Sequence, residues 1–127
     1  MIKPCLYLQG LPGKGRGVFT HQRLAARTII EESPVIVMTK SDRIHLDKTL
    51  LHDYIFEWGD KKDKCCMALG LIPMYNHNYK SNCEYFMDFE KDIIQIKTIR
   101  VIEKNEELTI NYNGDWNDSK KIWFDVL

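Results

Sequence analysis

Residues 73–83 of this chain read Pro-Met-Tyr-Asn-His-Asn-Tyr-Lys-Ser-Asn-Cys, and this stretch decides the fold. It joins an apolar lead-in to the pair Asn76 and His77 and then to Asn82. Asn and His side chains carry donors and acceptors that must find partners when they are buried. The pattern therefore predicts a segment that is hydrogen-bonded through its side chains rather than laid down as a regular strand. Taken alone, the same residues are also typical of a polar turn.

A glycine-rich stretch lies upstream, where residues 13–19 read Gly-Lys-Gly-Arg-Gly-Val-Phe. Glycine permits positive φ and a close approach of the backbone to a ligand. A phosphate-binding Walker A loop is excluded because Gly15, rather than Ser or Thr, follows Lys14. A dinucleotide loop is excluded because β-type residues, not a helix, follow the glycines. On its own the stretch equally indicates a flexible hairpin turn.

A third stretch lies downstream, where residues 106–112 read Glu-Glu-Leu-Thr-Ile-Asn-Tyr. The pattern predicts a strand with a polar start that ends at Tyr112. A tyrosine at the end of a buried strand is often a packing residue whose hydroxyl finds a partner. Each stretch is a weak signal alone, and we expect the three to converge into one site.

Length and composition limit the classes of protein. The 127 residues predict one compact domain, and 44% apolar residues are enough to fill its core. The 18 basic and 18 acidic residues cancel, so no basic field predicts direct binding of nucleic acid. No apolar run reaches the roughly 18 residues of a membrane helix, and the first residues lack the apolar core of a secretory signal. The default expectation is a cytoplasmic protein.

The cysteines do not predict a metal site. Cys65 and Cys66 are adjacent, Cys5 and Cys83 are distant in sequence, and no Cys-x-x-Cys spacing occurs. We therefore expect no structural zinc and no other metal. Without a secretory signal, four cysteines are more typical of free thiols than of a disulfide framework.

The secondary structure is expected to be mostly β. Extended runs are predicted over residues 6–9, 18–20, 28–32, 35–38, 84–89, 93–98 and 108–110. Pro34 is expected to interrupt the ladder between two of these runs, and the runs 84–89 and 93–98 to form a hairpin.

Three parts of the chain are less regular. Residues 66–74 have a helical spacing of apolar side chains that is expected to end near Pro73. Residues 41–63 are open between a helical stripe and a strand over 54–56. The tail, residues 114–127, has a candidate helix start at Asn117 or Asp118.

In this order and at these separations, the three stretches resemble the SET-domain protein-lysine methyltransferases. Residues 15–19 look like the Gly-x-Gly motif of the family with its apolar-aromatic pair. Residues 76–82 look like its Asn-His-Ser-Cys-x-Pro-Asn motif, and residues 105–112 look like its Gly-Glu-Glu-Leu-x-x-x-Tyr motif. The resemblance spans essentially the whole chain and is to the small, minimal viral and bacterial members.

The chain departs from the family motifs at four positions. Asn78, Tyr79 and Ser81 replace the usual Ser, Cys and Pro, and Asn105 replaces the Gly before the two glutamates. We expect no zinc-binding segments of the kind that flank many members. The departures leave open an alternative function, a SET-like module that binds cofactor or peptide without turnover. A small β domain that associates through its tail aromatics is a third hypothesis.

The resemblance implies a β-clip-like SET fold of several small sheets with short helices and a C-terminal pseudoknot. It also implies one SET domain over residues 1–127, in which the tail, residues 114–127, closes the site. Because the chain lacks the flanking segments of larger members, a homodimer is one expectation.

The resemblance further implies transfer of methyl groups from S-adenosylmethionine to the side-chain amine of lysine in a protein. The substrate would be a histone tail or another protein, and a histone substrate would imply a nuclear or host-cell location. The implied catalytic residues are Tyr112 and Tyr85, and the implied lysine-binding residues are Tyr85, Ile110 and Tyr112. The implied cofactor-binding residues are Lys14, Gly15, Arg16, Tyr54, Asn76, His77 and Trp116. For Tyr54 and Trp116, plain core packing is an equal alternative.

Overall fold

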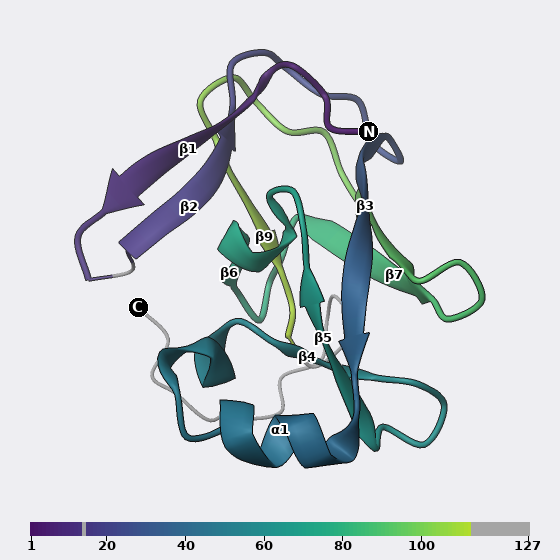
Figure 1. Ribbon diagram of the computed structural model, residues 1–127. Coiled ribbons are helices and arrows are strands. Elements are labelled where there is room, and N and C mark those ends of the chain that lie inside the picture. The colour runs from purple at the N-terminus through teal and green to yellow at the C-terminus, as the bar shows by residue number, and fades with distance from the viewer. Residues whose placement is uncertain (14, 113–127) are drawn as a thin grey trace.

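The computed structural model describes residues 1–13 and 15–112, and these residues are mostly β as predicted (Figure 1). One sheet has the strand order β1-β2-β9-β6 and the other has the order β4-β5-β3-β8-β7. Their bounds are β1 (Leu6–Leu11), β2 (Gly15–Thr20), β3 (Ile29–Met38), β4 (Phe56–Trp58), β5 (Lys64–Ala68), β6 (Asn76–His77), β7 (Cys83–Asp88), β8 (Ile93–Thr98) and β9 (Glu107–Ile110). Short helices connect the strands, namely α1 (Lys40–Leu46) and the 3₁₀ turns η1 (Leu50–Asp53) and η2 (Ile72–Met74).

The glycine stretch forms the turn of the β1–β2 hairpin. Leu11 pairs with Gly15 at its closed end, and both Gly13 and Gly15 have a φ of 74°. Residues with side chains rarely adopt this conformation, so glycine is required at the turn. The strand after the turn begins at Gly15, which is three residues earlier than predicted.

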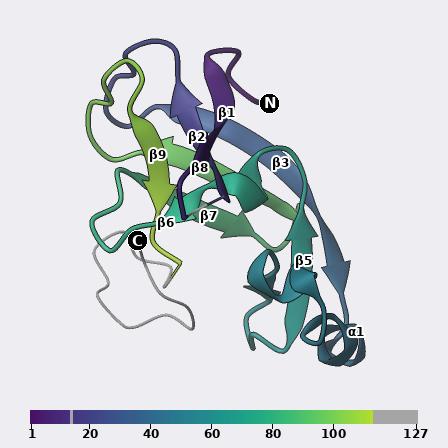
Figure 2. The same cartoon turned by 90° about the vertical axis from the view of Figure 1, so that its left-hand side faces the viewer.

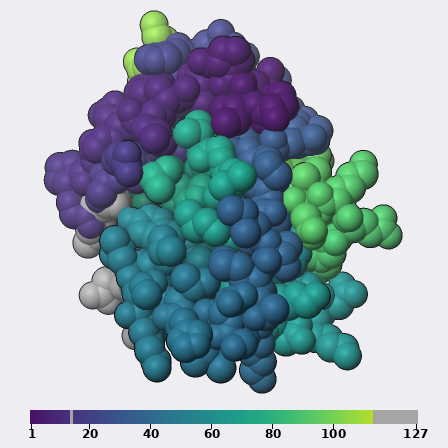
Figure 3. All heavy atoms as spheres, in the orientation of Figure 1, coloured from purple at the N-terminus to yellow at the C-terminus, as the bar shows by residue number. Residues whose placement is uncertain are grey.

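The β7–β8 hairpin has the predicted pairing. Glu84 lies opposite Lys97, and Phe86 lies opposite Gln95. Along β8, buried residues alternate with half-exposed ones, which is the pattern of a strand with one face on the core. The hairpin projects from the body of the molecule as the green segment in Figure 3.

Pro34 interrupts the ladder as predicted, but it does not divide the two predicted runs into separate strands. β3 runs unbroken from Ile29 to Met38, but it changes partner at the proline. Its residues up to Pro34 pair with β8, and its residues from Val35 pair with β5. Proline lacks an N–H group, and this loss is tolerated where one ladder ends and another begins.

The helix predicted over residues 66–74 is wrong. The chain forms β5 and then the η2 turn, with Cys65 and Cys66 fully buried between strands β3 and β4. Pairing on both sides outweighs the local helical spacing. Residues 41–63 contain both open alternatives, because α1 and η1 are followed by the short strand β4.

One apolar core joins the two sheets. Val18 and Leu108 of the first sheet and Ile94 and Ile96 of the second are fully buried in it. All four cysteines are buried and free, as predicted for thiols. Among the described residues, no helix is long and apolar enough to cross a membrane. The predictions for the tail, including its helix start, and for Lys14 lie outside the described residues.

Candidate active site

The central strand of the site is β9. It pairs antiparallel with β2, where Val18 lies opposite Leu108, and parallel with β6, where His77 lies opposite Ile110. Figure 2 shows β6 and β9 side by side, although they are about thirty residues apart in the sequence. In the space-filling view, the teal segment of η2 and β6 is seated between the purple β1–β2 hairpin and the blue β3 (Figure 3). The three stretches therefore converge, as the sequence predicted.

Gly17 is the point where all three stretches touch. A Cβ atom at this position would lie 2.5 Å from Glu107 Oε2 and 2.9 Å from Asn76 Nδ2. Asn76 Nδ2 donates hydrogen bonds to Glu107 Oε2 (2.8 Å) and to the carbonyl oxygen of Arg16 (3.2 Å). Only glycine leaves room for this arrangement, so the Gly-x-Gly spacing has a packing reason here.

The side chain of Asn82 forms hydrogen bonds with the backbone of β9, as a neighbouring strand would. Its Oδ1 accepts from the backbone N–H of Thr109 (2.8 Å), and its Nδ2 donates to the carbonyl oxygen of Glu107 (2.7 Å). Nδ2 also lies 3.2 Å from Glu106 Oε2. The side chain is buried, so these bonds satisfy backbone groups that would otherwise lack partners. The predicted side-chain bonding of residues 73–83 is thus observed, while the pseudoknot stays a prediction.

The imidazole of His77 is buried against the end of β9. Its Nδ1 accepts from the backbone N–H of Tyr112 at 2.9 Å. The neutral ring therefore carries its proton on Nε2, which has no hydrogen-bond partner among the described residues. Burial lowers the pKa of His77, so the ring stays neutral at neutral pH.

Tyr112 extends from the end of β9 back towards the start of β6. Its hydroxyl donates to the carbonyl oxygen of Tyr75 at 2.7 Å. Burial raises the pKa of this hydroxyl, and the nearby Tyr54, Glu107 and Tyr85 add to the rise. Tyr112 is therefore a neutral phenol at neutral pH and acts as a hydrogen-bond donor.

The SET domain family model matches residues 15–113, which include all three converging stretches. The chain belongs to the SET-domain family. This membership confirms the fold and the prediction of a protein-lysine methyltransferase.

Similar proteins agree with this assignment. A curated Schizosaccharomyces pombe protein, a histone-lysine N-methyltransferase specific for lysine 37 of histone H3, is 36% identical over 126 residues. The match covers 98% of this chain and 80% of that protein.

Two solved structures share the fold. A Plasmodium falciparum protein assigned to the histone methyltransferases has a TM-score of 0.64 at 22% identity, covering 91% of this chain and 98% of that one. A humanized mutant of the Chaetomium thermophilum Polycomb Repressive Complex 2 bound to the inhibitor GSK126 has a TM-score of 0.71 at 17% identity. That match covers 88% of this chain and 15% of the larger one.

Tyr85 and Tyr54 lie beside Tyr112 in this SET domain. The Tyr85 hydroxyl donates to the backbone carbonyl oxygen of Tyr112 at 3.4 Å, and its ring centroid lies 5.9 Å from that of Phe56. Tyr54 is half-buried and acts electrostatically on the hydroxyl of Tyr112. The structure therefore brings Tyr85 and Phe56 together beside Tyr112, and these three side chains form a tyrosine wall.

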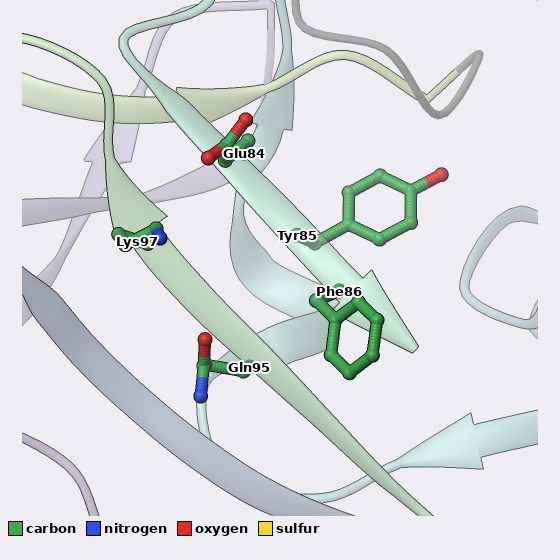
Figure 4. Close-up of a pocket in the computed structure, with 5 residues that line it drawn as sticks. All are labelled: Glu84, Tyr85, Phe86, Gln95 and Lys97. Carbon is green, nitrogen blue, oxygen red and sulfur yellow. The ribbon is translucent and has the colours of Figure 1, made fainter. Parts of the chain in front are cut away.

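A pocket of about 270 Å³ borders Tyr85 on the outer face of the β7–β8 hairpin. Glu84, Phe86, Gln95 and Lys97 complete its lining. Figure 4 shows the ring of Tyr85 pointing away from Gln95 and Lys97. This pocket thus lies on the other side of β7 from the tyrosine wall.

The remaining predicted residues have different positions. Ile110 is fully buried in the core rather than open to a ligand. Gly15 and Arg16 are exposed on β2, beyond the residues that pair with β9. Lys14 and Trp116 lie outside the described residues.

The departures from the family motifs have local explanations. Asn105 has a φ of 67°, and asparagine tolerates this left-handed conformation better than most residues with side chains. The Tyr79 ring packs edge-on against His77, with centroids 4.4 Å apart. Ser81 Oγ donates to the carbonyl oxygen of Cys83 at 2.9 Å. Tyr79 and Ser81 therefore each have a defined contact in the fold.

Asn82, Glu107 and Tyr75 have roles in the site that were not assigned from the sequence. All three lie inside or beside the family motifs. Their closeness in sequence to Asn76 or Tyr112 was the one sequence feature that could have indicated these roles. Their bonding partners are distant in sequence and could not be identified from spacing.

Proposed function

We propose that this SET domain transfers methyl groups from S-adenosylmethionine to the side-chain amine of lysine, with Tyr112 as its catalytic residue. The observation that carries the proposal is the position of the Tyr112 hydroxyl. It is held 2.7 Å from the carbonyl oxygen of Tyr75, directly before Asn76 and His77. A fixed donor beside a fixed carbonyl suits the orientation of an amine and a methyl group.

The residues around β2 and β6 fit such a cofactor. Gly15 and Arg16 are exposed at the start of β2, and a methyl group added at Gly15 would meet no other atom within 4 Å. His77 Nε2 is a buried donor with no partner in the described part of the chain. We assign cofactor binding to these residues and Asn76, and, from the sequence, to Lys14, Tyr54 and Trp116.

S-adenosylmethionine supplies an electrophilic methyl group on a sulfonium sulfur. A lysine amine that accepts this methyl group would release S-adenosylhomocysteine, and it must first lose its proton from an ammonium with an ordinary pKa of about 10.4. The aromatic side chains of Tyr85, Phe56 and Tyr54 would lower that pKa by removing water. Because Tyr112 is itself a neutral phenol, the proton leaves to water and Tyr112 orients rather than deprotonates.

The proposed substrate is a protein with an exposed lysine, and the relative specific for histone H3 makes a histone tail the first to test. A histone substrate would place the protein in the nucleus; a cytoplasmic substrate would not.

We further propose that residues 1–127 act as one domain, that residues 114–127 close the site, and that a homodimer completes it. Binding without turnover is the second candidate function, favoured by Asn78, Tyr79 and Ser81.

The test is mass spectrometry of a lysine-rich protein panel that includes histones, incubated with protein and S-adenosylmethionine. We expect mass increases on lysine and release of S-adenosylhomocysteine. Calorimetry with the cofactor alone is the companion measurement. Binding without methylation of any panel protein would favour the second candidate, and no binding at millimolar cofactor would contradict both.

A further inference from the structure

A carboxyl group lies buried behind the active site. Glu31 in β3 is fully buried, and its side chain accepts three hydrogen bonds. Its Oε2 accepts from Ser33 Oγ (2.6 Å) and from the backbone N–H of Leu71 (2.8 Å). Its Oε1 accepts from the hydroxyl of Tyr75 (3.0 Å). Burying a carboxyl group is costly unless donors satisfy it, and these three donors do so.

The backbone is shaped to admit this carboxyl group. Gly70 has a φ of 65°, and a Cβ atom there would collide with Glu31 Oε2 and Ser33 Oγ. Glycine is therefore required for the next residue, Leu71, to point its N–H at the carboxyl oxygen.

The carboxyl group joins the two ends of the η2 turn. Leu71 is the residue before the turn and Tyr75 is the residue after it. Burial raises the pKa of the Tyr75 hydroxyl, and Glu31 raises it further, so Tyr75 keeps its proton and remains a donor. One side chain thus fixes both the entry and the exit of the turn that leads into Asn76.

The exit of the turn is also the acceptor for Tyr112. The carbonyl oxygen of Tyr75 accepts from the hydroxyl of Tyr112 at 2.7 Å. Tyr75 therefore has two contacts, one through its phenol to Glu31 and one through its backbone to Tyr112. A shift of the phenol moves the backbone oxygen that holds the Tyr112 hydroxyl.

We propose that Glu31 and Tyr75 are positioning residues for Tyr112. The inference rests on the proposed function, in which the Tyr112 hydroxyl orients the amine and the methyl group. Glu31 holds the phenol of Tyr75, and the carbonyl oxygen of Tyr75 holds the hydroxyl of Tyr112. Neither positioning residue touches the reacting atoms.

Tyr75→Phe is the primary test because it removes one hydroxyl and keeps the ring and the backbone carbonyl. We expect kcat to fall by about tenfold, with KM for cofactor and for substrate unchanged, because only the alignment is disturbed. Glu31→Gln should give the same pattern. The double variant should be no slower than the slower single variant, because the two residues act as one unit.

Ile102→Val is the matched control for a loss of stability alone. Ile102 is fully buried and pairs with Leu24. It takes part in none of the hydrogen bonds that link Glu31, Tyr75 and Tyr112. The substitution should lower the melting temperature and leave kcat unchanged. If Tyr75→Phe keeps the wild-type kcat, the positioning role is wrong. It is also wrong if Tyr75→Phe and Ile102→Val lower the melting temperature equally and Tyr75→Phe lowers kcat no more than Ile102→Val does.

A readout that needs no turnover separates the two proposals. In protein with ¹³C-labelled tyrosine, the ring signals of Tyr112 should shift in Tyr75→Phe and in Glu31→Gln but not in Ile102→Val. Unshifted signals would overturn the positioning role even in an active enzyme. A wild-type protein that methylates nothing would overturn the proposed function, while shifted signals would still support the link from Glu31 to Tyr112.

Discussion

Strands β8 and β9 of this SET domain are held in place in different ways. In the five-stranded sheet, β8 alternates buried Ile94 and Ile96 with half-exposed residues, and backbone pairing satisfies its polar groups. In the four-stranded sheet, β9 is bonded on part of one side by the side chain of Asn82 and by a two-residue strand. β8 is held by a repeating pattern, whereas β9 depends on single residues. Substitutions should therefore have larger and more specific effects around β9.

The largest expected effect is on turnover. Tyr112→Phe removes the hydroxyl that donates to the carbonyl oxygen of Tyr75. We expect kcat to fall by about a hundredfold because the reacting groups lose their alignment. Cofactor affinity, measured by calorimetry, should be unchanged.

Tyr7→Phe is the matched control for Tyr112→Phe. It removes a hydroxyl that lies 3.4 Å from Asn105 Oδ1 on the β1–β2 hairpin, and kcat should stay at the wild-type value. An unchanged rate in Tyr112→Phe would remove Tyr112 from the mechanism.

The next effect is on stability, and two substitutions compare β9 with β8 directly. Asn82→Ala leaves buried backbone groups of β9 without partners and should lower the free energy of unfolding by about 3 kcal/mol. Gln95→Ala removes one bond to Glu32 in the other sheet and should cost about 0.5 kcal/mol. Urea denaturation measures both. Equal losses of unfolding free energy would show that β9 depends on single side chains no more than β8 does.

A tenfold effect is expected on cofactor affinity. Gly17→Ala places a methyl group against Glu107 and Asn76, so it should displace the Asn76 side chain and weaken binding by about tenfold. Gly10→Ala is the control, because its added methyl group meets no atom within 4 Å. Calorimetry with S-adenosylmethionine should distinguish the two variants. Equal affinity would mean that the close approach at Gly17 serves packing alone.

The smallest effect is the pH dependence of stability from His77. Burial lowers its pKa in the folded state, so the unfolded state binds the proton more readily. The contribution of His77 to the free energy of unfolding should be constant above the ordinary histidine pKa of about 6.5. It should fall as the pH drops from there towards the folded-state pKa. In His77→Gln, the loss of unfolding free energy between about pH 8 and about pH 5.5 should be smaller than in wild type.

His52→Gln is the control for this pH dependence. His52 is on the surface and is paired with Asp47. In His52→Gln, the loss of unfolding free energy between about pH 8 and about pH 5.5 should be the same as in wild type. A wild-type and a His77→Gln curve with the same slope would contradict the assignment.

Much of the regular sheet could be predicted from the sequence. Period-two alternation marked β8, and the polar turn at residues 90–92 marked its hairpin with β7. The helical spacing of residues 66–74 misled because strands β3 and β4 pair with β5 on both sides. Local spacing does not contain that information.

The sequence by itself predicted the convergence of the glycine stretch, the Asn-His segment and the Tyr112 strand, because these motifs, in this order, resemble those of the SET-domain family. It also determined the residue types that a glycine turn and a buried amide require. Only the tertiary structure decided that Asn82 completes β9, that Gly17 makes room for Asn76 and Glu107, and that Glu31 connects to Tyr112 through Tyr75. The reason is physical: a buried polar atom must find a partner, but chain spacing does not specify which distant residue will supply it.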